Sequence, residues 1–232
     1  MDLAGKLVAI SPHFDDAVLS CGDWLAARPG GTVLTVYSGV PPSGTPLPDW
    51  DRRCGFARAD QAMLARHEEN RAAMATLGAR GLGLGLLDDQ YGGPGADAGR
   101  LTGALAAALT TLRPDVVLVP LGLFHQDHLR ASEAALVVWK LFREVLDSTW
   151  LAYEEALYRR KPGLVQQRLA ELRARRIRIT PLSGPPYRGS RKTRAVAAYA
   201  SQLRALGLVP GRGDDAAPER YWRLEPEEGA RY

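Results

Sequence analysis

Cysteine is scarce in this sequence, which has only Cys21 and Cys54 among its 232 residues. So few thiols in a chain of this size argue against a disulfide-stapled secreted scaffold. No cleavable apolar leader precedes the first strand-like segment, so we expect a reduced, cytoplasmic protein. The apolar run at residues 116–123 contains a proline and is far shorter than the ~20 residues that cross a bilayer, so we expect no membrane span.

Clustered basic and aromatic residues of the kind that bind nucleic acids are also lacking. The formal net charge is +4 and the pI is near 9.2. The excess comes from arginines that are densest over residues 159–194, without interleaved aromatic residues. We therefore expect no nucleic-acid partner. The composition, with 46% hydrophobic and 24% charged residues, is that of a globular protein with one sizeable core.

Short apolar runs alternate with amphipathic stretches along most of the chain. The runs predict strands at residues 7–10, 32–38, 81–87, 115–120 and 150–157. The stretches predict helices at residues 15–27, 58–77, 101–112, 129–146, 165–176 and 193–206. This order indicates an α/β fold with a Rossmann-like, mostly parallel sheet covered by helices on both faces. We expect a single domain over residues 1–232, a surface loop at residues 39–51 and an irregular tail at residues 210–232.

Three of the four histidines lie in two short clusters that each follow a predicted strand. The clusters are Ser-Pro-His-Phe-Asp-Asp at residues 11–16 and His-Gln-Asp-His at residues 125–128. In open parallel sheets, ligands bind at the carboxyl ends of strands. A catalytic zinc ion takes three imidazole or carboxylate ligands and keeps one position for water. Taken singly, either cluster could be structural, since aspartates often cap helices, but together they predict a metal centre.

The geometry of the two clusters suggests that some of their residues bind the metal and others transfer protons. Adjacent side chains at a turn point in different directions, so one of Asp15 and Asp16 would bind the metal and the other would act as general base. Of His125 and His128, one would be a ligand and the other would face the reacting carbonyl group. Asp127 would fix the tautomer of a histidine.

These clusters resemble the Pro-His-x-Asp-Asp and His-x-Asp-His motifs of the LmbE-like (PIG-L) family of zinc-dependent N-deacetylases. Weaker similarity runs through residues 66–78 and 199–202, so that the resemblance covers about four fifths of the chain. Phe14 and Gln126 depart from the family pattern, where proline is frequent at both positions. The resemblance implies a Zn²⁺ cofactor with three protein ligands, His13, Asp16 and His128.

The same resemblance assigns the remaining roles. Asp15 is implied to be the general base that takes a proton from the attacking water. His125 is implied to stabilise the oxyanion in its protonated form or to protonate the leaving amine, and Asp127 is implied to orient it. The sequence leaves open whether Asp15 or His125 delivers the proton.

Substrate contacts are less well defined by the sequence. Arg66 could contact the substrate or pair with Glu69 across one helical turn, and the pair is favoured. Asp88 follows the third strand at the same sheet edge, where it could reach sugar hydroxyls or cap a turn. Glu154 lies in a segment that is near the pocket in some relatives, but it equally fits an edge strand with solvated charges.

Other classes of protein use similar residues. A non-haem iron oxygenase also uses two histidines and one carboxylate, but such enzymes generally have a jelly-roll fold, and Asp15 would have no role there. A phosphatase with an aspartate nucleophile normally has one residue between its two carboxylates, whereas Asp15 and Asp16 are adjacent. A non-catalytic metal-binding protein would be expected to have lost the base or His125. We therefore predict an N-deacetylase.

The substrate is expected to be a small amino sugar that carries an N-acetylglucosamine-type amide. The composition, rich in arginine and alanine, suggests a bacterial source with a high-GC genome. In such bacteria these enzymes serve small-thiol or secondary-metabolite biosynthesis. The sequence leaves open both a monomer and a homo-oligomer.

Overall fold

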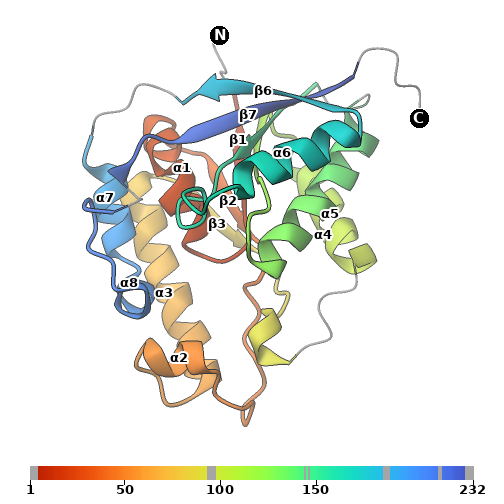
Figure 1. Ribbon diagram of the computed structural model, residues 1–232. Coiled ribbons are helices and arrows are strands. Elements are labelled where there is room, and N and C mark those ends of the chain that lie inside the picture. The colour runs from red at the N-terminus through yellow and green to blue at the C-terminus, as the bar shows by residue number, and fades with distance from the viewer. Residues whose placement is uncertain are drawn as a thin grey trace.

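The computed structural model describes residues 5–92, 98–143, 145, 147–184, 189–213 and 216–227. Within them, seven strands form one sheet with the order β3-β2-β1-β4-β5-β7-β6 (Figure 1). The strands are β1 (Leu7–Ser11), β2 (Thr32–Thr35), β3 (Arg80–Gly83), β4 (Val116–Pro120), β5 (Thr149–Tyr153), β6 (Ile177–Ser183) and β7 (Arg220–Pro226). The first five strands run parallel to one another, and β7 pairs antiparallel with both β5 and β6.

Helices cover both faces of this sheet, as predicted. They are α1 (Asp16–Ala27), α2 (Asp49–Arg53), α3 (Ala59–Leu77), α4 (Ala98–Leu112), α5 (Gln126–Phe142), α6 (Leu164–Ala174), α7 (Arg191–Ala197) and α8 (Ala200–Leu206), with a short 3₁₀ turn, η1 (Asp89–Tyr91). One face carries α1, α3 and α7, and the other carries α4, α5 and α6 (Figure 1). None of the helices in the described residues is both long and apolar enough to cross a bilayer.

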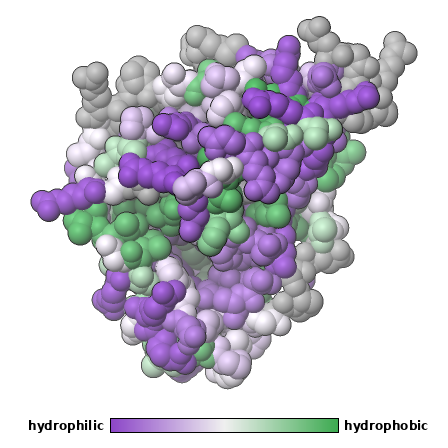
Figure 2. All heavy atoms as spheres, viewed as in Figure 1, coloured by the Kyte–Doolittle hydropathy of each residue, from purple (hydrophilic) through white to green (hydrophobic). Residues whose placement is uncertain are grey.

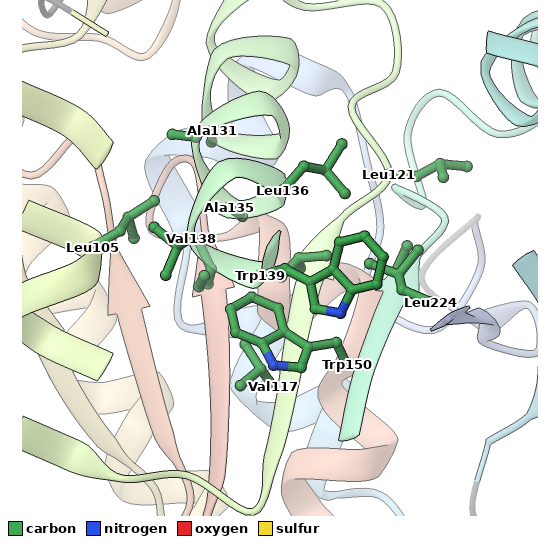
Figure 3. Packing of buried hydrophobic residues seen from close by; sticks show 14 of the residues in the cluster. Leu105, Val117, Leu121, Ala131, Ala135, Leu136, Val138, Trp139, Trp150 and Leu224 are labelled. Atoms are coloured by element: carbon green, nitrogen blue, oxygen red, sulfur yellow. The ribbon is translucent and has the colours of Figure 1, made fainter. Parts of the chain in front are cut away.

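The central strands are buried on both sides, which explains their continuous apolar sequence. In β1, Val8 and Ile10 pack into the layer of α4, α5 and α6, whereas Leu7 and Ala9 pack into the layer of α1, α3 and α7. Figure 3 shows the first layer, where Trp139 of α5 lies against Trp150 of β5. This packing fixes the central strands and therefore the loops that follow them.

The prediction of an irregular tail over residues 210–232 is wrong where β7 forms. This strand lies between β5 and β6, and β6 was not predicted either. Charged residues flank Tyr221 and Trp222 and lie on both sides of Leu224, so the apolar content of the segment is low. Tyr221 and Leu224 are nevertheless buried, because the sheet extends beyond its parallel part. Residues 228–232 lie outside the described residues.

Two further local predictions need correction. The helix expected at residues 193–206 is two helices, because the chain turns at Tyr199, whose buried hydroxyl donates to Phe14 O and Asn70 Oδ1. Glu69 then caps α8 by accepting from Ser201 N at 2.7 Å. The loop expected at residues 39–51 ends in α2, which begins at Asp49.

Replacement of Leu224 by alanine tests whether β7 belongs to the core. Because Leu224 is buried in the cluster of Figure 3, Leu224→Ala should lower the free energy of unfolding by about 2–5 kcal/mol. Urea unfolding measures this change. The matched control is Val209→Ala, at a side chain that is 57% exposed, and it should change stability by less than about 0.5 kcal/mol. Equal small effects of the two substitutions would contradict the packing of β7.

Candidate active site

The two histidine clusters lie side by side at the carboxyl edge of the sheet. The first follows β1 and the second follows β4, and these strands are neighbours. From β1 the chain crosses to β2 on one side, whereas β4 lies on the other side. Such a switch in strand order opens a crevice at the carboxyl ends of the strands. Residues more than a hundred positions apart therefore meet in one place.

Hydrogen bonds within the first loop fix the directions of its carboxylates. Ser11 Oγ accepts from Ala17 N at 3.0 Å, and the backbone amide of His13 donates to Asp16 Oδ2 at 2.8 Å. Asp15 occupies the N-cap position of α1 but makes no capping hydrogen bond within that helix, all of which is described. The Asp15 carboxylate is thus available for chemistry in the cavity, which it lines.

Asp16 lies between two imidazoles. Its Oδ2 is 3.1 Å from His13 Nδ1 and 3.2 Å from His128 Nε2. The ligand atoms of these three residues all lie within 4.8 Å of one another, so the group could hold a metal ion. Two nitrogen donors and one oxygen donor, with His128 and Asp16 buried, suit a catalytic zinc site. The structure thus brings together the three residues that the sequence proposed as ligands.

The second nitrogen of His13 contacts Asp127. His13 Nε2 is 3.2 Å from Asp127 Oδ2, and Asp127 is fully buried. A histidine that binds metal through one nitrogen commonly donates from the other to a carboxylate, which fixes its tautomer. His13, His125 and Asp127 form a second possible metal-binding group. An ion in this second group would bind His13 through Nε2 instead of Nδ1. The buried side chains of His128 and Asp16 would then not contact the ion.

The expectation that the Asp127 carboxylate orients His125 needs correction. Asp127 Oδ2 is 3.9 Å from His125 Nδ1, too far for a hydrogen bond. The backbone amide of Asp127 donates to His125 Nδ1 instead, at 3.2 Å, because His125 is the N-cap residue of α5. This bond places the proton of a neutral His125 ring on Nε2.

Electrostatic interactions separate the protonation states of the carboxylates and imidazoles. Burial raises the pKa of Asp16, but His128 and His13 outweigh it and hold this pKa well below its usual value. Burial lowers the pKa of His128, but Asp16 and Glu155 outweigh it and raise this pKa to about 9. The buried carboxylates thus favour a positive charge beside them. A metal cation bound there would supply that charge in place of the protons on the imidazoles.

The pKa values of Asp15 and His125 shift in directions opposite to those of Asp16 and His128, respectively. Burial and the charge of Asp16 raise the pKa of Asp15 to about 6. Burial, with His13 and His128 nearby, lowers the pKa of His125. Asp15 and Asp16 are adjacent, yet their environments push their pKa values apart, which is typical of carboxylates with different roles. Asp15 suits a proton acceptor near neutral pH, and Asp16 suits a permanently charged ligand.

A cavity of about 410 Å³ opens beside these residues. Its walls carry His13, Asp15, Asp16 and His125 together with polar and apolar side chains of other elements, among them Tyr37, Trp50, Met63, Asp89, Gln90, Leu157, Tyr158, Gln202 and Leu206. The volume suits a small molecule of about the size of a sugar derivative. Trp50, Gln90 and Leu206 were not identified from the sequence, because no motif marks them.

Two of the three proposed substrate-binding residues line this cavity, but their contacts differ from those expected. Arg66 does not pair with Glu69; it forms a buried ion pair with Asp51 and donates to Tyr91 Oη at 3.0 Å. Asp88 accepts from Gln90 N at 3.1 Å and also lies 3.6 Å from His13 Nε2. It therefore caps η1 and borders the site.

Glu154 is the proposed substrate-binding residue that the structure excludes from this cavity. Its carboxylate accepts from Trp222 Nε1 at 2.9 Å, on the side of β7. Its neighbour Glu155 points toward the site, where Oε1 lies 3.4 Å from His128 Nδ1, close enough for an ion pair but long for a hydrogen bond. Glu155 Oε1 also accepts from the amides of Gly122 and Leu123. The sequence indicated the segment but not which glutamate turns inward.

Comparison with known sequences identifies one family. The sequence model of the GlcNAc-PI de-N-acetylase family (PIG-L) matches residues 8–139, which include both clusters. A comparison with curated proteins finds no match.

Solved structures with the same fold include enzymes of different activities. A zinc-inhibited form of teicoplanin deacetylase is 22% identical over 97% of this chain and 100% of its own, with a TM-score of 0.75. The N,N'-diacetylchitobiose deacetylase of Pyrococcus horikoshii is 17% identical, covers 95% of this chain and 84% of its own, and has a TM-score of 0.57. The 4-carboxy-2-hydroxymuconate hydratase of Pseudomonas putida is 16% identical over 99% of both chains, with a TM-score of 0.63. Likeness at these identities establishes the fold alone.

Substitution of the two adjacent glutamates separates a role at the candidate metal site from a role in packing. Glu155→Gln keeps the shape of the side chain but removes the charge beside His128, so it should weaken binding of Zn²⁺ by about 10- to 100-fold. Glu154→Gln is the matched control, because Glu154 is equally buried but contacts Trp222. Competition with a chromogenic chelator measures both affinities. Equal zinc affinities of the two variants would contradict the role of Glu155.

Proposed function

Because the chain belongs to the PIG-L (LmbE-like) family of deacetylases, we propose that it is a zinc-dependent N-deacetylase. Its substrate would carry the acetamide, or a related acyl amide, of an N-acetylglucosamine-type sugar or glycoside. The observation that carries the proposal is the placement of buried Asp16 between His13 and His128, with Asp15 and His125 on the wall of the same cavity.

The three proposed ligands, His13, Asp16 and His128, fit a zinc ion by their donor atoms and by their mutual distances. When bound, the ion would polarise the amide carbonyl group and lower the pKa of water near it. Asp127 would hold His13 in the tautomer that presents Nδ1 to the ion, by accepting from Nε2. For His128 the nitrogens are reversed: Glu155 lies 3.4 Å from Nδ1, and its charge would favour the tautomer that presents Nε2 to the ion.

Proton transfer is assigned to Asp15. With a pKa raised to about 6 by burial and by Asp16, Asp15 is ionised at neutral pH and can take a proton from the attacking water as the C–O bond forms. The bond between the carbonyl carbon and the amide nitrogen then breaks. The leaving nitrogen must gain a proton, and Asp15 holds the one it took from water.

His125 is assigned to the oxyanion in its neutral form. Its Nδ1 accepts from the Asp127 amide, so Nε2 carries the proton and can donate to the carbonyl oxygen as negative charge develops there. One well-placed donor of this kind contributes about 3 kcal/mol to the transition state. Because the lowered pKa disfavours a second proton on His125, we assign delivery to the amine to Asp15.

The polar edge formed by Asp88, Asp89 and Gln90 would receive sugar hydroxyls, and Arg66 would form part of the cavity wall near it. We place the reaction in the cytoplasm of a bacterium, in small-thiol or secondary-metabolite biosynthesis, on the basis of the sequence composition and of the family. The alternating α/β sheet disfavours the oxygenase alternative. A non-catalytic metal-binding role would leave the positions of Asp15 and His125 without a purpose.

Metal content and acetate release test the proposal together. The purified protein should contain about one zinc ion per chain. It should release acetate from N-acetylglucosamine derivatives, and a chelator should abolish the release reversibly, because the ion is needed to polarise the amide. Elemental analysis and an enzymatic acetate assay measure the two quantities. Absence of bound metal after loading with Zn²⁺, or acetate release that persists after complete metal removal, would refute the proposal.

The assignment of the base predicts a separation of binding from catalysis. Asp15→Asn should lower kcat by about 10²- to 10⁴-fold and leave bound zinc unchanged, because it removes a proton acceptor and no ligand. His128→Ala should instead lower the zinc content. Steady-state kinetics and elemental analysis of the two variants provide the check, and near-normal turnover by Asp15→Asn would rule out its role as the base.

A further inference from the structure

Phe124 is an unusual residue at the edge of the site. It precedes His125 in the loop between β4 and α5, and it is 61% exposed to solvent. Its backbone adopts a φ of 62°, in the left-handed region that side chains other than glycine seldom occupy. His125 N donates to Leu123 O at 2.7 Å, which closes a three-residue turn around Phe124. A γ-turn with positive φ is rare and strained.

Both the positive φ and the exposure to solvent therefore disfavour phenylalanine at position 124. Glycine would adopt this φ without a steric cost, and a polar side chain would avoid exposing an apolar ring to water. Strained backbone held in place by surrounding structure tends to occur at functional sites. The contacts of the exposed Phe124 ring therefore bear on its function.

Aromatic contacts connect Phe124 to the metal centre. Its ring centroid lies 5.3 Å from that of Tyr158 at an interplanar angle of 35°, and the Tyr158 ring lies 5.2 Å from His128 at 75°. Tyr158 lines the cavity, and Lys161 Nζ lies 4.1 Å from the Phe124 centroid. The two rings thus form a continuous aromatic surface from the proposed ligand His128 to the solvent. Tyr158 and Lys161 restrain the outer ring of this surface.

We propose that Phe124 and Tyr158 form an aromatic platform that binds an apolar aglycone of the substrate, and that Phe124 thereby determines specificity. This inference rests on the proposed function and adds a class of substrate, an amino-sugar glycoside whose aglycone bears an aromatic ring. The sugar amide would occupy the cavity beside Asp15, and the aglycone would leave the cavity over the platform. A flat aromatic group can pack against restrained rings in stacked or edge-to-face geometry.

Figure 2 shows that apolar side chains gather in a band across the middle of one face, among hydrophilic ones. Apolar exposure alone therefore does not mark a binding site on this protein. Leu141 is 62% exposed, as much as Phe124, but it is aliphatic and lies at the end of α5 farther from His125. Phe124 is distinguished by its aromatic neighbours and its place beside His125, and Leu141 provides a matched control.

The test compares two probes that differ only in their aglycone, 4-nitrophenyl and methyl N-acetyl-β-D-glucosaminide. Binding is measured by calorimetry with zinc-loaded protein that carries Asp15→Asn, so that the probes stay intact. The parent protein should bind the nitrophenyl probe about three- to tenfold more tightly than the methyl probe. Phe124→Gly should abolish this difference and leave binding of the methyl probe unchanged. Phe124→Tyr and Leu141→Ala should both retain it.

Glycine relieves the backbone strain at position 124, so the thermal stability of Phe124→Gly should equal or exceed that of the parent. Equal binding of the two probes by the parent, no binding of either, or retention of the preference by Phe124→Gly would overturn the platform. Failure of the proposed function is a different result, because wild-type protein loaded with zinc would then release no acetate from either probe. The binding preference and acetate release can thus succeed or fail separately.

Discussion

The site is organised around one buried carboxylate held between two imidazoles. Asp16 lies within 3.2 Å of nitrogens on both His13 and His128, and none of these groups is stable in an apolar interior without the others. Burial of a charge is costly unless it is paired and hydrogen-bonded. The loop after β1 and the first turn of α5 are therefore tied together by electrostatic need as well as by the adjacency of their strands. Both motifs have to be present for either to be stable.

The same pairing explains how two neighbouring aspartates acquire different chemistry. Asp16 gains the stabilisation of two imidazoles, whereas Asp15 receives mainly desolvation and repulsion from Asp16. The direction of each side chain decides which environment it enters, and that direction comes from the turn at the start of α1. A difference of one position along the chain thus becomes a difference between the proposed ligand and the proposed base. No further motif is required to distinguish the Asp15 carboxylate from that of Asp16.

The alternation of apolar runs and amphipathic stretches predicted the parallel core well, because strands buried on both faces carry a continuous apolar signal. The same reasoning failed for β6 and β7, where charged residues such as Arg178 and Glu225 dilute the apolar signal of the two antiparallel strands at this end of the sheet. The histidine clusters marked the centre of the site, since chemistry restricts residue type there. Glu155 and Tyr158 were not identified, because their role depends on which way the chain turns after β5.

The position of β7 has a consequence for biosynthesis. β5 is hydrogen-bonded to β7 on one edge, Glu154 N donates to Arg220 O, and the Glu154 carboxylate accepts from Trp222. The segment that carries Glu155 and Tyr158 is therefore anchored by residues near the C-terminal end of the chain. A nascent polypeptide still missing those residues would have both histidine clusters but no support on this side of them. The proposed metal ligands could thus come together before β7 joins the sheet, whereas the side of the site that carries Glu155 and Tyr158 would be in place only afterwards.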